Sequence, residues 1–225
     1  MNLIDRIKNI LLSPKTEWQA IASEPATVPG LYKSYIAIIA AAPALAGFIK
    51  SSLIGYGAFG LSARTPIANG LIGAIIGYAL SLALVYVMAL IVNTLAPIFG
   101  GRKNLTEALK TVAYAATASC VASIGLVIAW LGLLIVLAGS IYNIYLLYRG
   151  LPVTMKCPPE KAAGYTAISV VCAIVLSWSC AIATGMVIGG AAMASGAPSH
   201  AVFDQNTWPG KMEAANAQMN RQSAP

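Results

Sequence analysis

Charged residues are scarce in this sequence. Only 9% of its 225 residues are Asp, Glu, Lys or Arg, whereas a typical soluble domain has about 25%. Between Arg64 and Asp204 the charges fall into two short clusters, and the runs that separate them are apolar. With 58% apolar residues and a mean hydropathy of +0.75, this pattern excludes a soluble globular domain. It predicts an all-α, polytopic integral membrane protein.

Groups that carry catalysis or bind metals are also few. The single histidine, His200, lies near the C-terminus, which excludes a multi-histidine metal site and a Ser-His-Asp arrangement. The seven acidic residues are scattered and form no carboxylate pair for acid–base chemistry. The four cysteines lack C-x-x-C spacing and are predicted to be small buried thiols. We therefore predict no enzymatic activity, no metal site and no cofactor.

The net charge of +7 raises the question of a nucleic-acid partner. Proteins that bind nucleic acids gather their basic residues on one folded face. Here the basic residues flank the apolar runs, so we interpret them as topology signals and contacts with lipid headgroups. We expect no nucleic-acid partner.

The apolar runs predict a bundle of five membrane-spanning helices. The run from Thr111 to Tyr148 contains no Asp, Glu, Lys or Arg. As one helix it would be about 57 Å long, nearly twice the ~30 Å hydrocarbon core of a bilayer, so it must turn back. We expect the turn around 119–125, where serines and a glycine interrupt the run. The predicted spans are about 35–53, 69–96, 106–122, 126–148 and 163–194.

The segments outside the spans predict further features. Met1 to Leu12 has apolar residues at helical spacing with charges opposite, so residues 1–33 are expected to be a cytosolic amphipathic helix at the membrane interface and a linker. Trp18 is expected to anchor this segment at the interface. Glu107 and Lys110, three residues apart, predict an ion pair at the start of a helix. The polar tail, 195–225, is expected to be flexible and mostly irregular.

Counting the basic residues predicts the orientation. With five spans, one side of the membrane receives ten of the fourteen Lys and Arg residues and the other side receives four. The side with more basic residues is cytoplasmic by the positive-inside rule. We therefore expect the N-terminus inside the cell and the C-terminus outside.

Small residues recur at spacings of four or seven in several predicted spans, a pattern typical of closely approaching transmembrane helices. Three glycines spaced by seven are expected on one side of the fourth helix, where they would form a groove. We interpret these positions as packing within the bundle, with a homo-oligomer interface as the alternative. The candidate helix-packing residues are Gly73, Gly77, Gly125, Gly132, Gly139, Ala181, Gly185 and Gly189.

Polar residues near the ends of two spans allow a different hypothesis, a transporter or channel for a small solute. Hydrogen bonding between helices is the alternative role, and we favour it because transport sites usually include a charge within the membrane. The candidate polar path is Asn93, Tyr142, Asn143 and Tyr145, with Thr94 and Ser140 beside it.

Several motifs resemble the Yip family, the Ypt/Rab-interacting membrane proteins with a five-span domain. Leu12-Ser13-Pro14 and Trp18 precede the first span, and Pro43 lies inside it. The most specific block surrounds the loop from Arg149 to Lys161. Its family-like residues are Tyr148, Gly150, Leu151, Pro152, Pro158, Pro159 and Lys161. Over about residues 5–190 the chain resembles a bacterial member of this family.

The resemblance implies five helices and a cytosolic N-terminus. In eukaryotic relatives it implies binding to prenylated small GTPases and a role in vesicle traffic. For this chain we predict a non-enzymatic protein of the bacterial cytoplasmic (inner) membrane that organises the membrane or is a partner subunit of a membrane complex. Its expected partners are the lipid bilayer and another membrane protein or a second copy of itself.

Overall fold

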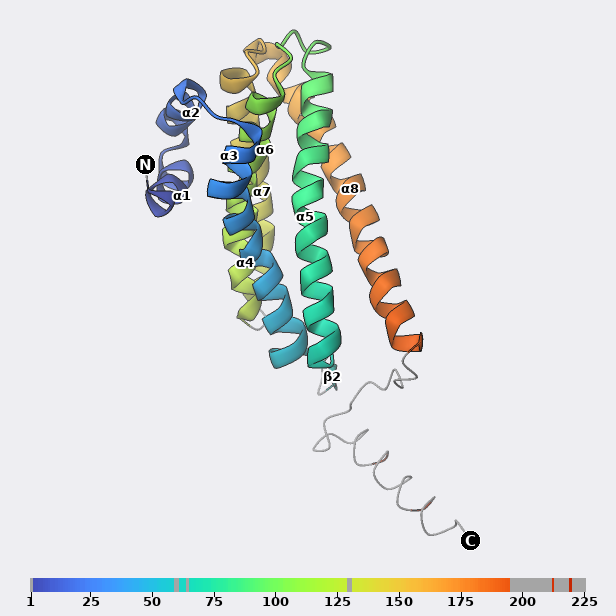
Figure 1. Cartoon of the computed structure of the whole chain (residues 1–225). Coiled ribbons are helices and arrows are strands. Elements are labelled where there is room, and N and C mark those ends of the chain that lie inside the picture. The colour runs from blue at the N-terminus through green and yellow to red at the C-terminus, as the bar shows by residue number, and fades with distance from the viewer. Residues whose placement is uncertain are drawn as a thin grey trace.

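A computed structural model describes residues 2–58, 61–63, 65–128 and 131–194, together with Met212 and Met219. The tail expected over 195–225 lies outside the described residues, apart from these two methionines. Within the described ranges, five helical stretches are long and apolar enough to cross a membrane (Figure 1). They are Val28–Ile54, Ile67–Leu95, Leu105–Val127, Leu131–Thr154 and Pro159–Met186. The protein is therefore a five-helix membrane bundle, as predicted.

Two short helices precede the bundle, and the spans are built from several helical elements. The N-terminal pair is α1 (Leu3–Leu12) and α2 (Pro14–Ser23). The first span contains α3 (Val28–Leu31), the π-helical turn η1 (Tyr32–Ile36), α4 (Ala37–Phe48) and a second π-helical turn, η2 (Ile49–Ile54). The other spans contain α5 (Ile67–Leu95), α6 (Leu105–Ser123) with the 3-10 turn η3 (Ile124–Val127), α7 (Leu131–Thr154) and α8 (Pro159–Ala194).

Local sequence signals explain where several helices begin. The Asn104 side chain caps α6 by accepting hydrogen bonds from the backbone amides of Thr106 and Glu107 at 3.1 and 3.3 Å. The Thr27 side chain accepts one from Gly30 at the start of α3. Pro66 directly precedes α5, where its missing amide hydrogen costs no helical hydrogen bond.

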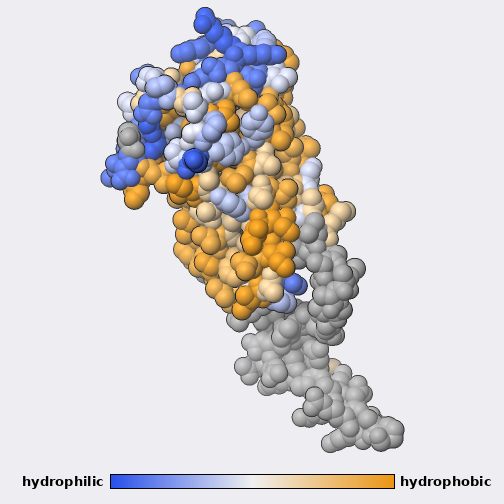
Figure 2. All heavy atoms as spheres, viewed as in Figure 1, coloured by the Kyte–Doolittle hydropathy of each residue, from blue (hydrophilic) through white to orange (hydrophobic). Residues whose placement is uncertain are grey.

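Helix α6 lies at the centre of the bundle. It contacts α4, α5 and α7, and its residues are buried without interruption from Ala108 to Ala115. Helix α8 lies on the outside, against α5 and α7. The lipid-facing sides of α5, α7 and α8 expose large apolar side chains such as Ile75, Leu133 and Val175. These form a broad apolar zone below a hydrophilic end in Figure 2, as a bilayer requires.

Two connections differ from the sequence expectation. The turn expected around 119–125 lies further along, because α6 runs to Ser123 and α7 begins at Leu131. Ser119 and Ser123 do not end the helix, since their hydroxyls donate to carbonyls of the preceding turn, at 2.9 and 2.6 Å. The loop expected between the first two spans contains a small antiparallel hairpin of β1 (Tyr56–Ala58) and β2 (Leu61–Ala63).

The N-terminal helices and two inter-helix connections gather near one end of the bundle (Figure 1). The Arg102 amide donates to the Met155 carbonyl at 2.8 Å, which joins the α5–α6 connection to the α7–α8 connection. The β hairpin lies at the opposite end. We call α1 and α2 together the N-terminal cap.

Candidate functional site

The cap is held to the bundle by a buried cluster of charges. Arg6 in α1 is only 5% exposed, and its Nη1 donates to Oε1 of Glu17 at 2.7 Å. Its Nη2 donates to Glu24, and its guanidinium lies 5.8 Å from the ring centroid of Tyr114 in α6. Burial alone lowers the pKa of Arg6, but the hydrogen bond and charge of Glu24, with the charge of Glu17, give a net rise in that pKa. Arg6 is therefore a permanent cation.

A second buried cation joins the cap to α6. Lys110 is 2% exposed, and its Nζ donates to Oε1 of Glu107 at 2.8 Å, so the ion pair predicted from their spacing is confirmed. The same Nζ donates to the carbonyls of Ile21 and Glu24, at 3.1 and 2.6 Å. These carbonyls belong to the last turn of α2 and its C-cap. The last carbonyls of a helix have no partner within the helix, and at the end of α2 Lys110 supplies the missing donor.

Trp18 fixes the other side of the cap. It is 1% exposed and is not the interface anchor that the sequence suggested. Its ring lies directly on Gly150 of α7, where a Cβ atom would come within 2.7 Å of it. Nearby, the Tyr142 hydroxyl donates to the Leu11 carbonyl at 2.7 Å. The amphipathic helix α1 turns Ile10 fully inward and leaves Ile4 and Leu12 exposed. Leu3, Ile7 and Leu11 are partly buried against the core, so four of the six apolar side chains of α1 pack on protein.

The family-like block falls partly inside a helix. The loop expected from Arg149 to Lys161 is only four residues long, 155–158, because α7 continues to Thr154. The Thr154 hydroxyl bonds both the Gly150 carbonyl and the Thr111 hydroxyl of α6, which holds the last turn in place. Of the block residues, Gly150 and Leu151 are buried, and Pro152 is half-buried within α7. The exposed ones are Tyr148, Pro158, Pro159 and Lys161.

Of the four candidate polar-path residues, only Asn143 lines the cavity between α7 and α8. Asn143 lines a cavity of about 450 Å³ between α7 and α8, and its Nδ2 lies 3.5 Å from the Ser119 hydroxyl. That cavity is not lined by Asn93, Tyr142 or Tyr145. Tyr142 binds the cap, whereas Asn93 on α5 has a buried Oδ1 with no hydrogen-bond partner among the described residues.

The glycines predicted to pack helices fall into two groups. Gly139 and Gly132 bring α7 close to α6 and η3: a Cβ at 139 would meet the Ala122 Cβ at 2.2 Å, and one at 132 would meet the Gly125 carbonyl at 2.6 Å. Gly125 itself lies in η3, so the three glycines do not share one side of a single helix. The groove that they would form is occupied by the preceding helix of the same chain.

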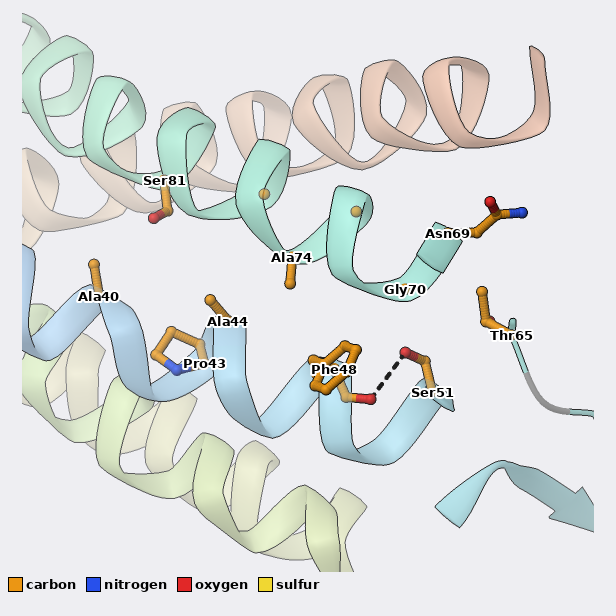
Figure 3. A pocket seen from close by; sticks show the side chains of 13 residues that line it. Ala40, Pro43, Ala44, Phe48, Ser51, Thr65, Asn69, Gly70, Ala74 and Ser81 are labelled. Atoms are coloured by element: carbon orange, nitrogen blue, oxygen red, sulfur yellow. Dashed lines mark hydrogen bonds between the residues drawn. The ribbon is translucent and has the colours of Figure 1, made fainter. Parts of the chain in front are cut away.

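Three of the remaining small residues, Gly77, Ala181 and Gly185, have no close helix neighbour. A Cβ at Gly77 or Gly185 would meet nothing within 4 Å, and Ala181 is exposed. Gly189 lies in α8. Gly73 and Gly77 line a cavity of about 380 Å³ between α4 and α5. Figure 3 shows this cavity lined by small side chains, including Ala40 and Ala44 of α4 and Ala74 of α5. Among the described residues, none that lines it is charged.

Among the described residues, no group of three or more His, Cys, Asp and Glu side chains could hold a metal ion. The acidic residues with assigned roles, Glu17, Glu24 and Glu107, are all engaged with Arg6 or Lys110. These three carboxylates therefore hold the cap on the bundle.

Comparison with known proteins identifies the family. The family model described as the Yip1 domain matches residues 8–196, which is most of the chain. The protein belongs to the Yip1 domain family. Two similar curated proteins are named inner membrane protein YohC, from Escherichia coli strains K12 and CFT073. Each is 28% identical over 159 residues, covering 68% of this chain and 80% of the relative. No solved structure matches the chain. The family match begins within α1 of the cap and covers the whole bundle.

The buried charge cluster is the part of this site that sequence reasoning missed. Arg6 and Glu17 are eleven residues apart and lie on two different helices, so no helical spacing links them. One sequence signal could have revealed this ion pair. Arg6 shares a helix face with the apolar residues Leu3, Ile7 and Ile10. A charge at that position needs a partner if the face is buried.

Proposed function

We propose that this Yip1 domain protein is a non-enzymatic membrane organiser or partner subunit of a membrane complex, which binds other proteins through its cap end. The observation that carries this proposal is the use of its buried charges. Arg6 and Lys110 fix a rigid cap on the bundle, whereas the described residues around the cavity between α4 and α5 are uncharged and mostly small. Such an arrangement suits a preorganised contact surface better than a reaction centre or an ion path.

The proposed location is the bacterial inner membrane, with the cap in the cytoplasm. The name of the YohC relatives supports the location, and the excess of basic residues at the cap end supports the orientation. Reporters fused before Met1 and after Pro225 test the orientation. We expect a cytoplasmic reporter to work only at the N-terminus and a periplasmic reporter only at the C-terminus. Activity of one reporter at both ends would contradict it.

Site-specific photo-crosslinking in cells tests the contact surface. A photoreactive residue at exposed Lys161 is expected to capture a discrete partner, and the same residue at lipid-facing Leu133 serves as the control. The capture should be lost when Arg6→Met loosens the cap. The proposal fails if both positions give the same products, or if the protein purified in mild detergent contains neither a partner nor a second copy.

The transport hypothesis is tested separately through Asn93 and Asn143. Solute flux into liposomes that falls on replacing both by Leu would support it, and unchanged flux would remove it. The structure favours the role of a packing residue for Asn143, since its amide faces the Ser119 hydroxyl.

A further inference from the structure

Two cavities of the described chain lie one after the other along α7 and α8, and we call the two together the groove. The upper cavity, of about 360 Å³, lies where α2 of the cap meets α7 and the start of α8. The lower cavity, of about 450 Å³, lies further along the same two helices. On α7, Ile144 of the lower cavity and Tyr148 and Pro152 of the upper one are spaced by four. Residues spaced by four share one face of a helix, so both cavities lie along the same face of α7.

The upper cavity carries two cations that the cap does not use. Lys15 of α2 and Arg149 of α7 both line it, and neither has an ion-pair partner among the described residues. This contrasts with Arg6 and Lys110, whose charges are balanced by carboxylates. The exposed residue Gln19 adds an amide beside them. The cavity therefore has an excess of positive charge and donors.

Two further features of the upper cavity favour an anion. Trp18 lines it, and the buried indole N–H of this residue has no acceptor among the described residues. A buried donor without an acceptor costs about 1–3 kcal/mol, so an acceptor oxygen supplied at this wall would be stabilised. Pro159, which begins the 36-residue helix α8, also lines the cavity and places the positive end of the helix dipole there.

The lower cavity is suited to a hydrocarbon chain. It is lined mainly by apolar residues of α7 and α8, among them Ile144, Ile174 and Trp178. From Ala162 in the upper cavity to Val170 in the lower one, α8 rises roughly 12 Å at ~1.5 Å per residue. The lower cavity therefore lies about two helical turns further along α8, beside exposed apolar residues such as Val171 and Val175, whereas the upper one lies beside the cap.

We propose that this groove binds one anionic phospholipid. Its phosphate contacts Lys15 and Arg149, and one acyl chain follows α7 and α8 to Trp178. A free phosphate compound would match the cations but not the groove, and a zwitterionic lipid would match the groove but carries no net negative charge. Such a lipid would fill the space between the cap and α8. This inference is independent of the proposed protein partner.

Native mass spectrometry of the full chain in mild detergent tests the proposal. After incubation with phosphatidylglycerol or phosphatidylcholine, we expect one retained phosphatidylglycerol and little phosphatidylcholine. Lys15→Gln and Arg149→Gln should each weaken retention about fivefold, since one cation near an anionic lipid contributes about 1 kcal/mol. The matched control is Lys8→Gln with Lys103→Gln, which removes two exposed cations outside the cavity and should leave retention unchanged.

The acyl-chain position is tested by tryptophan fluorescence. Phosphatidylglycerol with a brominated acyl chain should quench the protein, and Trp178→Phe should remove that quenched component. Glycerol phosphate at the same concentration distinguishes a lipid from a free phosphate compound, and we expect it not to bind.

The proposal is overturned by equal retention of the two lipids, by unchanged retention in Lys15→Gln, or by glycerol phosphate binding as tightly as the lipid. Because Lys15 is exposed, Lys15→Gln should fold normally. It therefore tests the proposal even if Arg149→Gln fails to fold.

Discussion

The indole ring of Trp18 lies against the backbone of Gly150, across 132 positions of the chain. A Cβ atom at position 150 would lie 2.7 to 2.9 Å from three atoms of the ring, closer than real Cβ contacts. Because Trp18 is fully buried, the ring has little room to move away. The absence of a side chain at 150 is therefore a condition for docking the cap.

We predict that Gly150→Ala loosens the cap and destabilises the protein by about 1–3 kcal/mol, as overpacking of a filled core does. Thermal unfolding in detergent measures the stability, and limited proteolysis within α1 and α2 reports on the cap. Gly77→Ala is the matched control, because its new Cβ meets nothing within 4 Å. Equal melting temperatures of the two variants would contradict the prediction.

We predict that Arg6→Met costs about 3–5 kcal/mol, because it leaves the carboxylate of Glu17 buried without its partner. The double variant Arg6→Met with Glu17→Met removes both charges and should recover most of that loss. Chemical or thermal unfolding measures both variants. A double variant less stable than Arg6→Met alone would show that the pair does not act as a unit.

We predict that the contribution of Arg6 to cap docking is constant from about pH 6 to pH 10. The folded-state pKa of Arg6 lies above its ordinary value, because the carboxylates of Glu24 and Glu17 stabilise the charged form. A raised pKa in the folded state gives stability that is fully present below the unfolded pKa and is lost only as the pH rises through the folded value. Hydrogen exchange of α1 at several pH values, corrected for intrinsic rates, measures this. A loss of protection near neutral pH that depends on Arg6 would contradict it.

We predict that Cys157 reacts slowly with alkylating reagents in the folded protein. It is 4% exposed, and burial raises the pKa of its thiol. A raised pKa reduces the thiolate fraction at pH 8, and the reactive form increases only as the pH rises towards that pKa. Mass spectrometry of alkylated peptides before and after denaturation measures this. A cysteine placed at exposed Lys161 is the control and should react quickly.

We predict that Gly139→Val separates α7 from α6 and lowers the melting temperature strongly. The added side chain would occupy the position of the Ala122 Cβ, which lies 2.2 Å from the first new atom. Gly185→Val, on the open face of α8, is the control and should be tolerated. Equal melting temperatures of the two variants would show that Gly139 does not lie against Ala122 of α6.

The sequence predicts the five spans well because long apolar runs have few alternatives in a bilayer. Helix ends are harder to predict, since they depend on local competition for backbone groups. Ser119 and Ser123 look like turn residues, but their hydroxyls bond within α6 and the helix continues. Similarly, Gly150 and Pro152 look like loop residues, but the Thr154 hydroxyl holds this last turn of α7.

The cap could not be predicted because its contacts join distant parts of the chain. An amphipathic helix with Trp18 nearby has the pattern of a membrane-surface segment. Two residues of the bundle favour docking of the cap on protein. Gly150 leaves room for the Trp18 ring, and Lys110 donates hydrogen bonds to the end of α2. Neither residue belongs to the N-terminal segment, so the residue spacing within that segment cannot predict the docking.

The bond from Lys110 to the end of α2 also sets an order of events during synthesis. The ribosome makes α1 and α2 before α6 and α7, whose surfaces receive them and which emerge about a hundred residues later. Until then, Arg6 and Trp18 have no docking surface on the bundle. The cap is consequently made early but docks late, and its docking reports that α6 and α7 are in place.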